Sequence, residues 1–281
     1  MTLTVFLAVI AAAAMHASWN ALIKVRADRF ASISITSLGM ALIAVPVLPF
    51  VTFPAFSVWP WIAASIVIHV GYRLFLVMAY DAGDLAQTYP LARGTAPLMT
   101  AVGAIFLVGE VPGPIAILGI MLLSSGTFLM SLKGGAELGR LNRRAVGYAL
   151  ATSVFIAGYT LTDGYGARLA ETASSYAAWL FLCDGLCSIL IGFAYRGKSL
   201  LPVIAREWKG GLLAGALSAG AYWIAMWAMT RAPIASIAAL RETSILFAVL
   251  LSVFLLGEKA TSWRLGAAAL IVFGAIALRL G

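Results

Sequence analysis

Residues 89–110 read YPLARGTAPLMTAVGAIFLVGE, and residues 237–258, which follow 148 positions later, read IAALRETSILFAVLLSVFLLGE. Each stretch is a long apolar run that carries an arginine near its start and ends in Gly-Glu. An arginine inside a lipid-spanning helix costs about 3 kcal/mol unless it finds a partner or a water-filled cavity. Its recurrence in register predicts a duplicated membrane protein with a functional centre. Superposing the stretches pairs Arg93 with Arg241, Thr95 with Thr243, Phe106 with Phe254, Leu107 with Leu255, Gly109 with Gly257 and Glu110 with Glu258.

The composition is that of an integral membrane protein. Hydrophobic residues make up 62% of the chain, charged residues make up 11%, and the mean hydropathy is +0.99. Charged residues form about 25% of an ordinary soluble domain. The net charge of +8 does not indicate nucleic-acid binding, because the basic residues lie in short loops and form no stripe with interleaved aromatic residues. Cys183 and Cys187 lack the further ligands that a zinc site requires, so we expect no metal.

Apolar runs of 18 or more residues recur along the whole chain. Such a run can cross a hydrocarbon core of about 30 Å as a helix, at about 1.5 Å per residue. We therefore expect an all-α protein with ten transmembrane helices. Their expected ranges are 3–23, 31–51, 57–80, 85–108, 111–132, 145–166, 174–195, 209–229, 233–256 and 262–280.

The longest loop, residues 133–144, divides the ten expected helices into two groups of five. Both groups place the FLxGE pattern at the end of their fourth helix. Because five is odd, two copies with the same internal order must lie in the bilayer with opposite orientations. The sequence therefore predicts two inverted five-helix repeats, residues 1–136 and 137–281, which is a common plan of secondary transporters.

The basic residues are distributed unevenly between the two sides of the expected bundle. The even-numbered loops and the C-terminus hold only Arg168, Arg231 and Arg279. The positive-inside rule then places the odd-numbered loops in the cytoplasm and both termini outside. The 13 basic residues of the odd-numbered loops are Lys24, Arg26, Arg29, Lys133, Arg140, Arg143, Arg144, Arg196, Lys198, Arg206, Lys209, Lys259 and Arg264.

The chain resembles the drug/metabolite transporter superfamily, in particular the EamA-type ten-helix permeases. The resemblance covers essentially the whole chain and rests on the two five-helix halves, on FLVGE at 106–110, on FLLGE at 254–258 and on HASWNALIK at 16–24. It implies a secondary transporter in which helices of both halves surround a central cavity. It also implies termini in the cytoplasm, opposite to the charge count. The segment HASWNALIK is further similar to a subgroup associated with phosphonate utilisation.

The first and third helices carry polar residues on one face. His16 and Asn20 are four apart, with Trp19 beside them, and we expect His16 and Asn20 to line a cavity rather than only to hydrogen-bond between helices. In the third helix, Arg73 follows His69 by four residues. Its guanidinium suits anion binding, but it could equally form a structural pair with Asp184 or Asp163.

The fourth and ninth helices carry the two pseudo-symmetric arginines. Tyr89, Arg93 and Thr100 share one face, and Arg241 is followed by Glu242. We hypothesise that an anionic group of the substrate lies between Arg93 and Arg241. The alternative is that Arg241 pairs with Glu242 or Asp163 and only fixes helix packing.

Other polar and aromatic residues complete the candidate site. Tyr222 and Trp223 of the eighth helix could wall the pocket. Asp163 lies near the expected end of the sixth helix, where solvent could reach it, whereas Asp184 is mid-span and must be paired or neutral. The candidates for proton coupling are His16, Glu242 and Asp184.

Enzyme motifs such as G-x-S-x-G, H-E-x-x-H and a Walker loop are absent from the sequence. We therefore expect that the protein is not an enzyme and binds no cofactor. Transport would be driven by a gradient or by exchange. The expected protein is a multi-pass protein of the bacterial inner membrane, monomeric or homodimeric, with a small anionic or zwitterionic substrate. The alternatives are an exporter of cationic or lipophilic compounds that uses Glu242 and Asp184, and a membrane enzyme or scaffold.

Overall fold

The computed structural model describes residues 1–281 except 25–28, 83–84, 132–141 and 257–260. All regular structure within these residues is helical. The α-helices are α1 (Leu3–Lys24), α2 (Arg29–Ala44), α3 (Trp59–Ala82), α4 (Leu85–Leu107), α5 (Pro114–Ser131), α6 (Arg143–Leu169), α7 (Ala173–Arg196), α8 (Leu200–Met229), α9 (Ile234–Arg241), α10 (Ser244–Leu256) and α11 (Ser262–Leu280). Short 3-10 helices, η1 (Val45–Phe50), η2 (Phe56–Val58) and η4 (Gly197–Ser199), occur in the connections.

Seven segments in the described part of the chain are long and apolar enough to cross a membrane. They are Leu3–Leu22, Ala31–Phe50, Phe56–Ala79, Arg143–Leu169, Ala173–Met229, Ile234–Phe254 and Ser262–Leu280. The segment Ala173–Met229 contains both α7 and α8, and α4 and α5 supply shorter apolar stretches, Leu91–Leu107 and Pro114–Met130. The prediction of a helical membrane protein is thereby confirmed.

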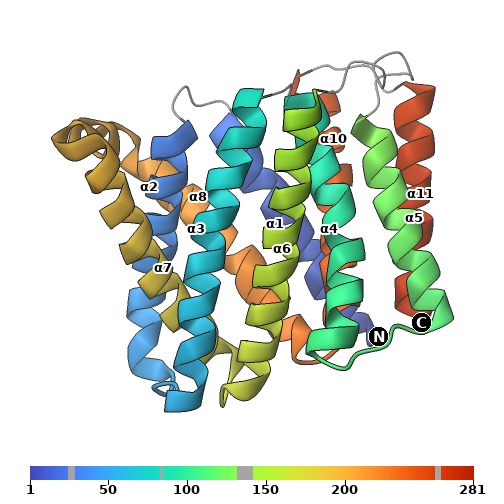
Figure 1. Ribbon diagram of the computed structural model, residues 1–281, viewed down its shortest axis with the longest axis horizontal. Coiled ribbons are helices and arrows are strands. Elements are labelled where there is room, and N and C mark those ends of the chain that lie inside the picture. The colour runs from blue at the N-terminus through green and yellow to red at the C-terminus, as the bar shows by residue number, and fades with distance from the viewer. Residues whose placement is uncertain (25–28, 83–84, 132–141, 257–260) are drawn as a thin grey trace.

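The helices stand side by side in one bundle, and both chain termini lie at the same end of it (Figure 1). The most extensive contacts join α5 to α11, α3 to α6, α4 to α6, α1 to α8, and α2 to both α7 and α8. Helices far apart in the sequence thus form the core, and α4, α6 and α9 contact one another.

Glycine residues permit the closest helix contacts. A Cβ atom on Gly215 of α8 would lie 2.6 Å from the carbonyl carbon of Gly39 in α2, and a Cβ on Gly274 of α11 would lie 2.8 Å from the carbonyl oxygen of Gly119 in α5. Lipid tails are as apolar as leucine, so helices associate in membranes through such backbone packing rather than through the hydrophobic effect.

Two of the predicted helices are shortened or interrupted in the structure. The predicted helix 31–51 ends at Ala44, because Pro46 and Pro49 turn the following residues into the 3-10 helix η1. The predicted helix 233–256 is interrupted at Glu242 and Thr243. There the Thr243 N–H bonds to the Leu240 carbonyl at 3.1 Å, and the Thr243 hydroxyl donates to the same oxygen at 2.7 Å. Such side-chain bonding to the preceding turn bends helices.

Candidate functional site

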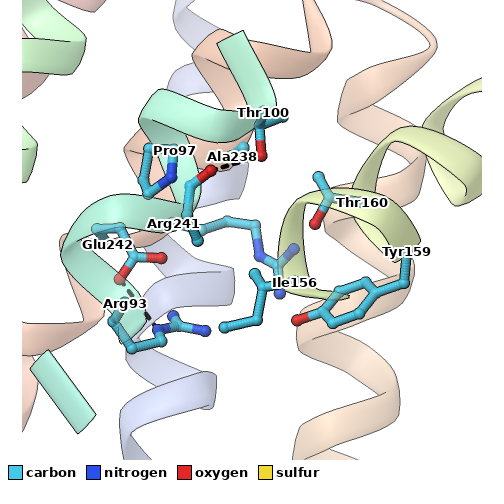
Figure 2. A pocket seen from close by; sticks show the side chains of 10 residues that line it. Arg93, Pro97, Thr100, Ile156, Tyr159, Thr160, Ala238, Arg241 and Glu242 are labelled. Carbon is cyan, nitrogen blue, oxygen red and sulfur yellow. Dashed lines mark hydrogen bonds and ion pairs between the residues drawn. The ribbon is translucent and has the colours of Figure 1, made fainter. Parts of the chain in front are cut away.

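A small pocket lies where α4, α6 and α9 meet, and it has room for about one water molecule. Figure 2 shows the guanidinium groups of Arg93 and Arg241 entering it from two different helices, near the ring of Tyr159. The structure thus brings together the two arginines that the repeat predicts to be equivalent. The pocket is lined by Arg93, Ala96, Pro97, Thr100, Ile156, Tyr159, Thr160, Ala238, Arg241 and Glu242.

Arg93 and Glu242 form a buried ion pair across the pocket wall. The Arg93 Nε atom lies 3.1 Å from Glu242 Oε2, and the two residues are 4% and 3% exposed. Glu242 follows Arg241 directly, at the break between α9 and α10. Neighbouring residues of a helix point in different directions. The Glu242 side chain therefore extends toward α4 and pairs with Arg93, and it forms no ion pair with the adjacent Arg241.

Arg241 is held by an aromatic ring. Its guanidinium lies 4.9 Å from the centre of the Tyr222 ring, and Figure 2 shows it pointing toward Tyr159 and Thr160. Among the residues that the structure describes, no acid forms an ion pair with Arg241. A guanidinium that is not occupied by an ion pair can donate two parallel hydrogen bonds to an anion.

His16 of α1 interacts electrostatically with both Arg93 and Arg241. Trp19 Nε1 donates to His16 Nδ1 at 3.2 Å, and the Asn20 amide donates to the His16 carbonyl oxygen at 2.8 Å. Because Nδ1 accepts this hydrogen bond, a neutral His16 ring carries its proton on Nε2. The polar face of α1 predicted from the sequence therefore adjoins the arginine pair through His16, whereas Asn20 is bonded within its own helix.

Residues 143–280 match the EamA-like transporter family. The chain belongs to this family. It is accordingly a membrane transporter of the drug/metabolite type and not an enzyme. One solved structure, described as "Crystal structure of protein", is similar over 99% of this chain and 96% of its own, with a TM-score of 0.78 and 20% identity. At this identity the likeness shows a shared fold. The comparison with curated proteins found no match.

The EamA-like transporter holds two other predicted site residues in an ion pair away from the pocket. Arg73 of α3 binds Asp184 of α7, with side chains 18% and 11% exposed. Neither residue lines the pocket. This pairing is the structural alternative that the sequence left open for Arg73.

The remaining predicted residues have different surroundings. Trp223 lies outside the pocket lining, where its Nε1 donates to Ser174 Oγ at 3.0 Å and its ring packs against Phe181. The Tyr222 ring contacts the Arg241 guanidinium, but Tyr222 does not line the pocket itself. Tyr89 belongs to α4, but its side chain lies outside the described residues, as do Gly257, Glu258 and the boundary between residues 136 and 137.

Asp163 is buried, which corrects the expectation that solvent could reach it. It has no exposed surface, because α6 continues to Leu169 and neighbouring helices cover the carboxylate. Tyr176 donates to Oδ1 at 2.9 Å, and Tyr222 donates to Oδ2. Asp163 is thus an internal carboxylate with a hydrogen bond to each of its oxygens.

The sequence reading missed Tyr159, which lines the pocket of the transporter. Tyr159 is 6% exposed, and the His69 ring stacks on it with centroids 4.3 Å apart. Tyr159 precedes Asp163 by four residues, which places both on one face of α6. This spacing is the feature of the sequence from which Tyr159 could have been predicted as a site residue. The small lining residues Ala96 and Ala238 carry no comparable signal.

Proposed function

We propose that the protein is a secondary active transporter that moves a small anionic or zwitterionic metabolite across the bacterial inner membrane by alternating access. The observation that carries this proposal is the pair of arginines, Arg93 and Arg241, that lines one pocket with a single acid, Glu242. Two cations against one acid leave the pocket lining with an excess of positive charge. Such a lining favours a ligand with an acidic group.

The positions of the arginines along their helices support a site near the middle of the membrane. Glu110, just beyond the end of α4, accepts a hydrogen bond from Ile234 N at the start of α9, so α4 and α9 begin at opposite ends of the bundle. Arg93 lies about 12 Å and Arg241 about 10 Å along these helices, at about 1.5 Å per residue. Their long side chains therefore approach the midplane from opposite sides, where secondary transporters bind substrate.

The packing of the helices supports two inverted five-helix repeats, 1–136 and 137–281, with α9 and α10 counted as one interrupted transmembrane helix. In this scheme α1 corresponds to α6, α3 to α8, and α5 to α11. The contact of α1 with α8 then has its counterpart in the contact of α6 with α3, and α5 meets its own counterpart α11. Ten transmembrane helices result.

The interrupted helix gives the proposed site a chemical role for Glu242. Discontinuous helices commonly form the binding sites of transporters with inverted repeats. An anion that engages Arg93 competes with the Glu242 carboxylate at 3.1 Å, and the released acid could then bind a proton. His16, which interacts electrostatically with both arginines, is a second candidate acceptor.

Thermal unfolding of the purified protein against a panel of methanesulfonate, methylphosphonate, carboxylates and zwitterionic amino acids tests the proposal. An anion that binds the folded state raises the melting temperature. Methylphosphonate belongs in the panel because of the resemblance of segment 16–24 to a phosphonate-associated subgroup. Uptake of the stabilising compound into proteoliposomes then measures transport.

Arg241→Ala and Arg93→Ala should each weaken anion binding by roughly thirtyfold, because truncating one partner of a buried charge pair costs about 2 kcal/mol or more. The matched control is the double variant Arg73→Ala, Asp184→Ala, which removes a pair outside the pocket and should leave anion binding unchanged. Anion transport that survives both single substitutions would contradict the arginine site. Uptake of cations that is independent of the arginines would instead support the exporter alternative.

A further inference from the structure

Charged contacts join the ends of the helices that line the arginine pocket. Glu110, just beyond the end of α4, pairs with Arg168 near the end of α6 at 2.6 Å. It also accepts a hydrogen bond at 2.8 Å from the Ile234 N–H group, at the start of α9. These three helix ends lie at the end of the bundle that carries the termini (Figure 1). We call this cluster, Glu110 with Arg168 and the Ile234 N–H group, the Glu110 latch.

Arg168 extends the latch to α8. Its Nε atom donates to the Met229 carbonyl oxygen at 2.8 Å, and its Nη2 atom donates to the Ala232 carbonyl oxygen at 3.1 Å. Helix α8 carries Tyr222, whose ring contacts the Arg241 guanidinium. The three helices that line the pocket, together with the helix that supplies this ring, therefore all end or begin at the latch.

Gly109 directs Glu110 toward the other helix ends. Its φ angle is +71°, in the left-handed region, and the Glu110 N–H bonds back to the Ala104 carbonyl oxygen at 3.1 Å. Glycine commonly ends helices in this conformation. A Cβ atom on Gly109 would meet no atom within 4 Å, so the position requires glycine for its backbone conformation and not for space.

The latch lies between the pocket and the solvent at the end with the termini. Arg168 follows the pocket residue Thr160 by eight positions in α6, which is about 12 Å along the helix. Ile234 precedes the pocket residue Ala238 by four positions in α9, which is about 6 Å. The side chains of Glu110 and Arg168 are partly exposed, whereas Thr160 and Ala238 are buried. Solvent thus reaches the latch but not the pocket behind it.

The latch joins helices that take different partners farther along the bundle. Helix α9 contacts α4 and α6, whereas α10, which follows α9 in the chain, packs against α1. Helices α4 and α6 pack extensively against each other. At the end with the termini, α9 can therefore move away from α4 and α6 only if the bonds of Glu110 and Arg168 to α8 and α9 break.

We propose that the Glu110 latch is the gate of the transporter on the side of the termini. It is closed in this structure, and it must open before the pocket can exchange a ligand with that side. This inference rests on the alternating access proposed above, but not on the charge of the substrate. Because the latch already borders solvent, water can hydrate its charges when they separate. The strength of the latch then sets how often the pocket opens to this side.

The accessibility of a cysteine in the pocket tests the gate. The probe is Thr160→Cys, a small change in the pocket lining (Figure 2), in a protein that also carries Cys183→Ser and Cys187→Ser. A membrane-impermeant anionic methanethiosulfonate is applied to spheroplasts or to inverted vesicles, and a C-terminal reporter shows which face carries the termini. From that face, labelling should be at least roughly tenfold slower than labelling of Val111→Cys, because Val111 is exposed beside the latch and the closed state is the more populated one.

Glu110→Gln weakens the latch and should open this side. The glutamine keeps an oxygen for the Ile234 N–H but loses the charged bond to Arg168. Labelling of Thr160→Cys from the face of the termini should rise roughly tenfold, as expected for the loss of a charged hydrogen bond, and labelling from the opposite face should not rise. The control Arg73→Gln, Asp184→Asn removes an ion pair outside the pocket and should leave both rates unchanged.

Gly109→Ala displaces Glu110 without removing a charge. Alanine disfavours the left-handed conformation, so labelling from the face of the termini should rise roughly fivefold. Gly113→Ala is the matched control, because its added Cβ also meets no atom within 4 Å and its φ is not positive. This control should label as slowly as the protein with an intact latch.

The outcomes separate the gate from a purely structural role. Rapid labelling of Thr160→Cys from the face of the termini with the latch intact overturns the gate, whether or not the latch variants fold. Equal increases from both faces in Glu110→Gln also overturn it, because the latch then only stabilises the fold. A third contrary result is the absence of any increase in both Glu110→Gln and Gly109→Ala.

The anion site is tested independently of the gate. Methanesulfonate that stabilises the wild-type protein while the labelling contradicts the gate leaves the anion site in place. Labelling that rises only from the face of the termini, in a protein that no anion of the panel stabilises, supports the gate and removes the anion site.

Discussion

The pair of Arg93 and Glu242 places two opposite charges in the transporter interior, 4% and 3% exposed. Removing one member of a buried pair leaves the other charge without compensation and typically costs about 3–5 kcal/mol. Glu242→Gln should therefore lower the melting temperature markedly. Methanesulfonate should raise the melting temperature of this variant by more than it does in the wild type, because the anion supplies the missing negative charge.

The double variant Arg93→Gln, Glu242→Gln is the control for this prediction. It removes both charges, so it should regain most of the lost stability and lose the extra response to methanesulfonate. Equal responses of the wild type and Glu242→Gln would show that the anion does not reach Arg93.

At the level of residues, the sequence predicts which arginines meet but not how they are partnered. The two arginines that the sequence pairs, Arg93 and Arg241, line one pocket. The alternative partners expected for Arg241 were Glu242, its neighbour in sequence, and Asp163; in the structure Glu242 forms its ion pair with Arg93. The direction of Glu242 depends on the break between α9 and α10. The environment of Asp163 likewise depends on Tyr176 and Tyr222 from other helices, which no local pattern reveals.

At the scale of helices, α2 and α8 pack backbone against backbone at Gly39 and Gly215. A Cβ on Gly215 would lie 2.6 Å from the Gly39 carbonyl carbon and 2.7 Å from its Cα. Backbone atoms cannot turn aside as a side chain can, so the two helices must separate. Gly215→Ala should destabilise the protein by about 1–3 kcal/mol, the usual cost of overpacking.

Gly147→Ala in α6 is the matched control, because no atom outside its own helix lies within 4 Å of the added Cβ. Alanine favours the helix by up to about 1 kcal/mol over glycine, so this variant should be as stable as the wild type or slightly more so. Thermal unfolding in detergent compares the two. Equal melting temperatures would mean that α2 and α8 can separate enough for the added methyl group without a loss of stability.

Glu110 joins three helix ends on the side of the bundle that carries the termini. Its Oε1 atom lies 2.6 Å from Arg168 Nη2, and its Oε2 accepts from Ile234 N at 2.8 Å. Arg168 in turn donates to the carbonyl oxygens of Met229 and Ala232. The Glu of the FLVGE pattern thus caps the start of α9, while Arg168 binds carbonyl groups at the end of α8 and beyond it, which gives the motif a physical role.

Glu110→Ala should lower the free energy of unfolding by about 2 kcal/mol, because it removes a charged hydrogen bond and the cap of a helix N-terminus. Arg206→Ala is the control, since the Arg206 side chain is 74% exposed in its pair with Glu207, and such surface pairs contribute about 0–1 kcal/mol. Thermal unfolding measures both. A loss no larger for Glu110→Ala than for Arg206→Ala would contradict the capping role.

The helix boundaries show what sequence patterns capture and what they miss. Apolar runs locate the helices, but they do not distinguish α-helix from 3-10 helix at Pro46 and Pro49. Nor do they show the interruption after Arg241, because Glu242 and Thr243 lie within an otherwise apolar run. The expected start of the eighth helix at residue 209 is late, since α8 begins at Leu200 and its first turns carry the charged residues Arg206 and Lys209. Charge marks the membrane boundary, whereas the helix continues beyond it.

For the whole molecule, the charge distribution predicts the direction of insertion. Arg168, Arg231 and Arg279 belong to the end with the termini. Arg168 pairs with Glu110, Arg279 donates to the Met1 carbonyl oxygen, and Arg231 lies over the Trp227 ring. The odd-numbered loops of the sequence carry 13 basic residues. Positive residues in short loops stay in the cytoplasm.

We therefore expect both termini outside the cytoplasm. Alkaline phosphatase fused after Gly281 should be active, because it folds only when exported, and green fluorescent protein at the same place should not fluoresce. Replacing the seven basic residues at 133, 140, 143, 144, 196, 198 and 206 with glutamine should reverse or mix the two signals, since these residues supply much of the charge difference. A fluorescent fusion of the unaltered chain would place the termini in the cytoplasm, as the family resemblance implies. The orientation would then be fixed by interactions such as the one between Glu110 and Arg168 that form after insertion, rather than by loop charge.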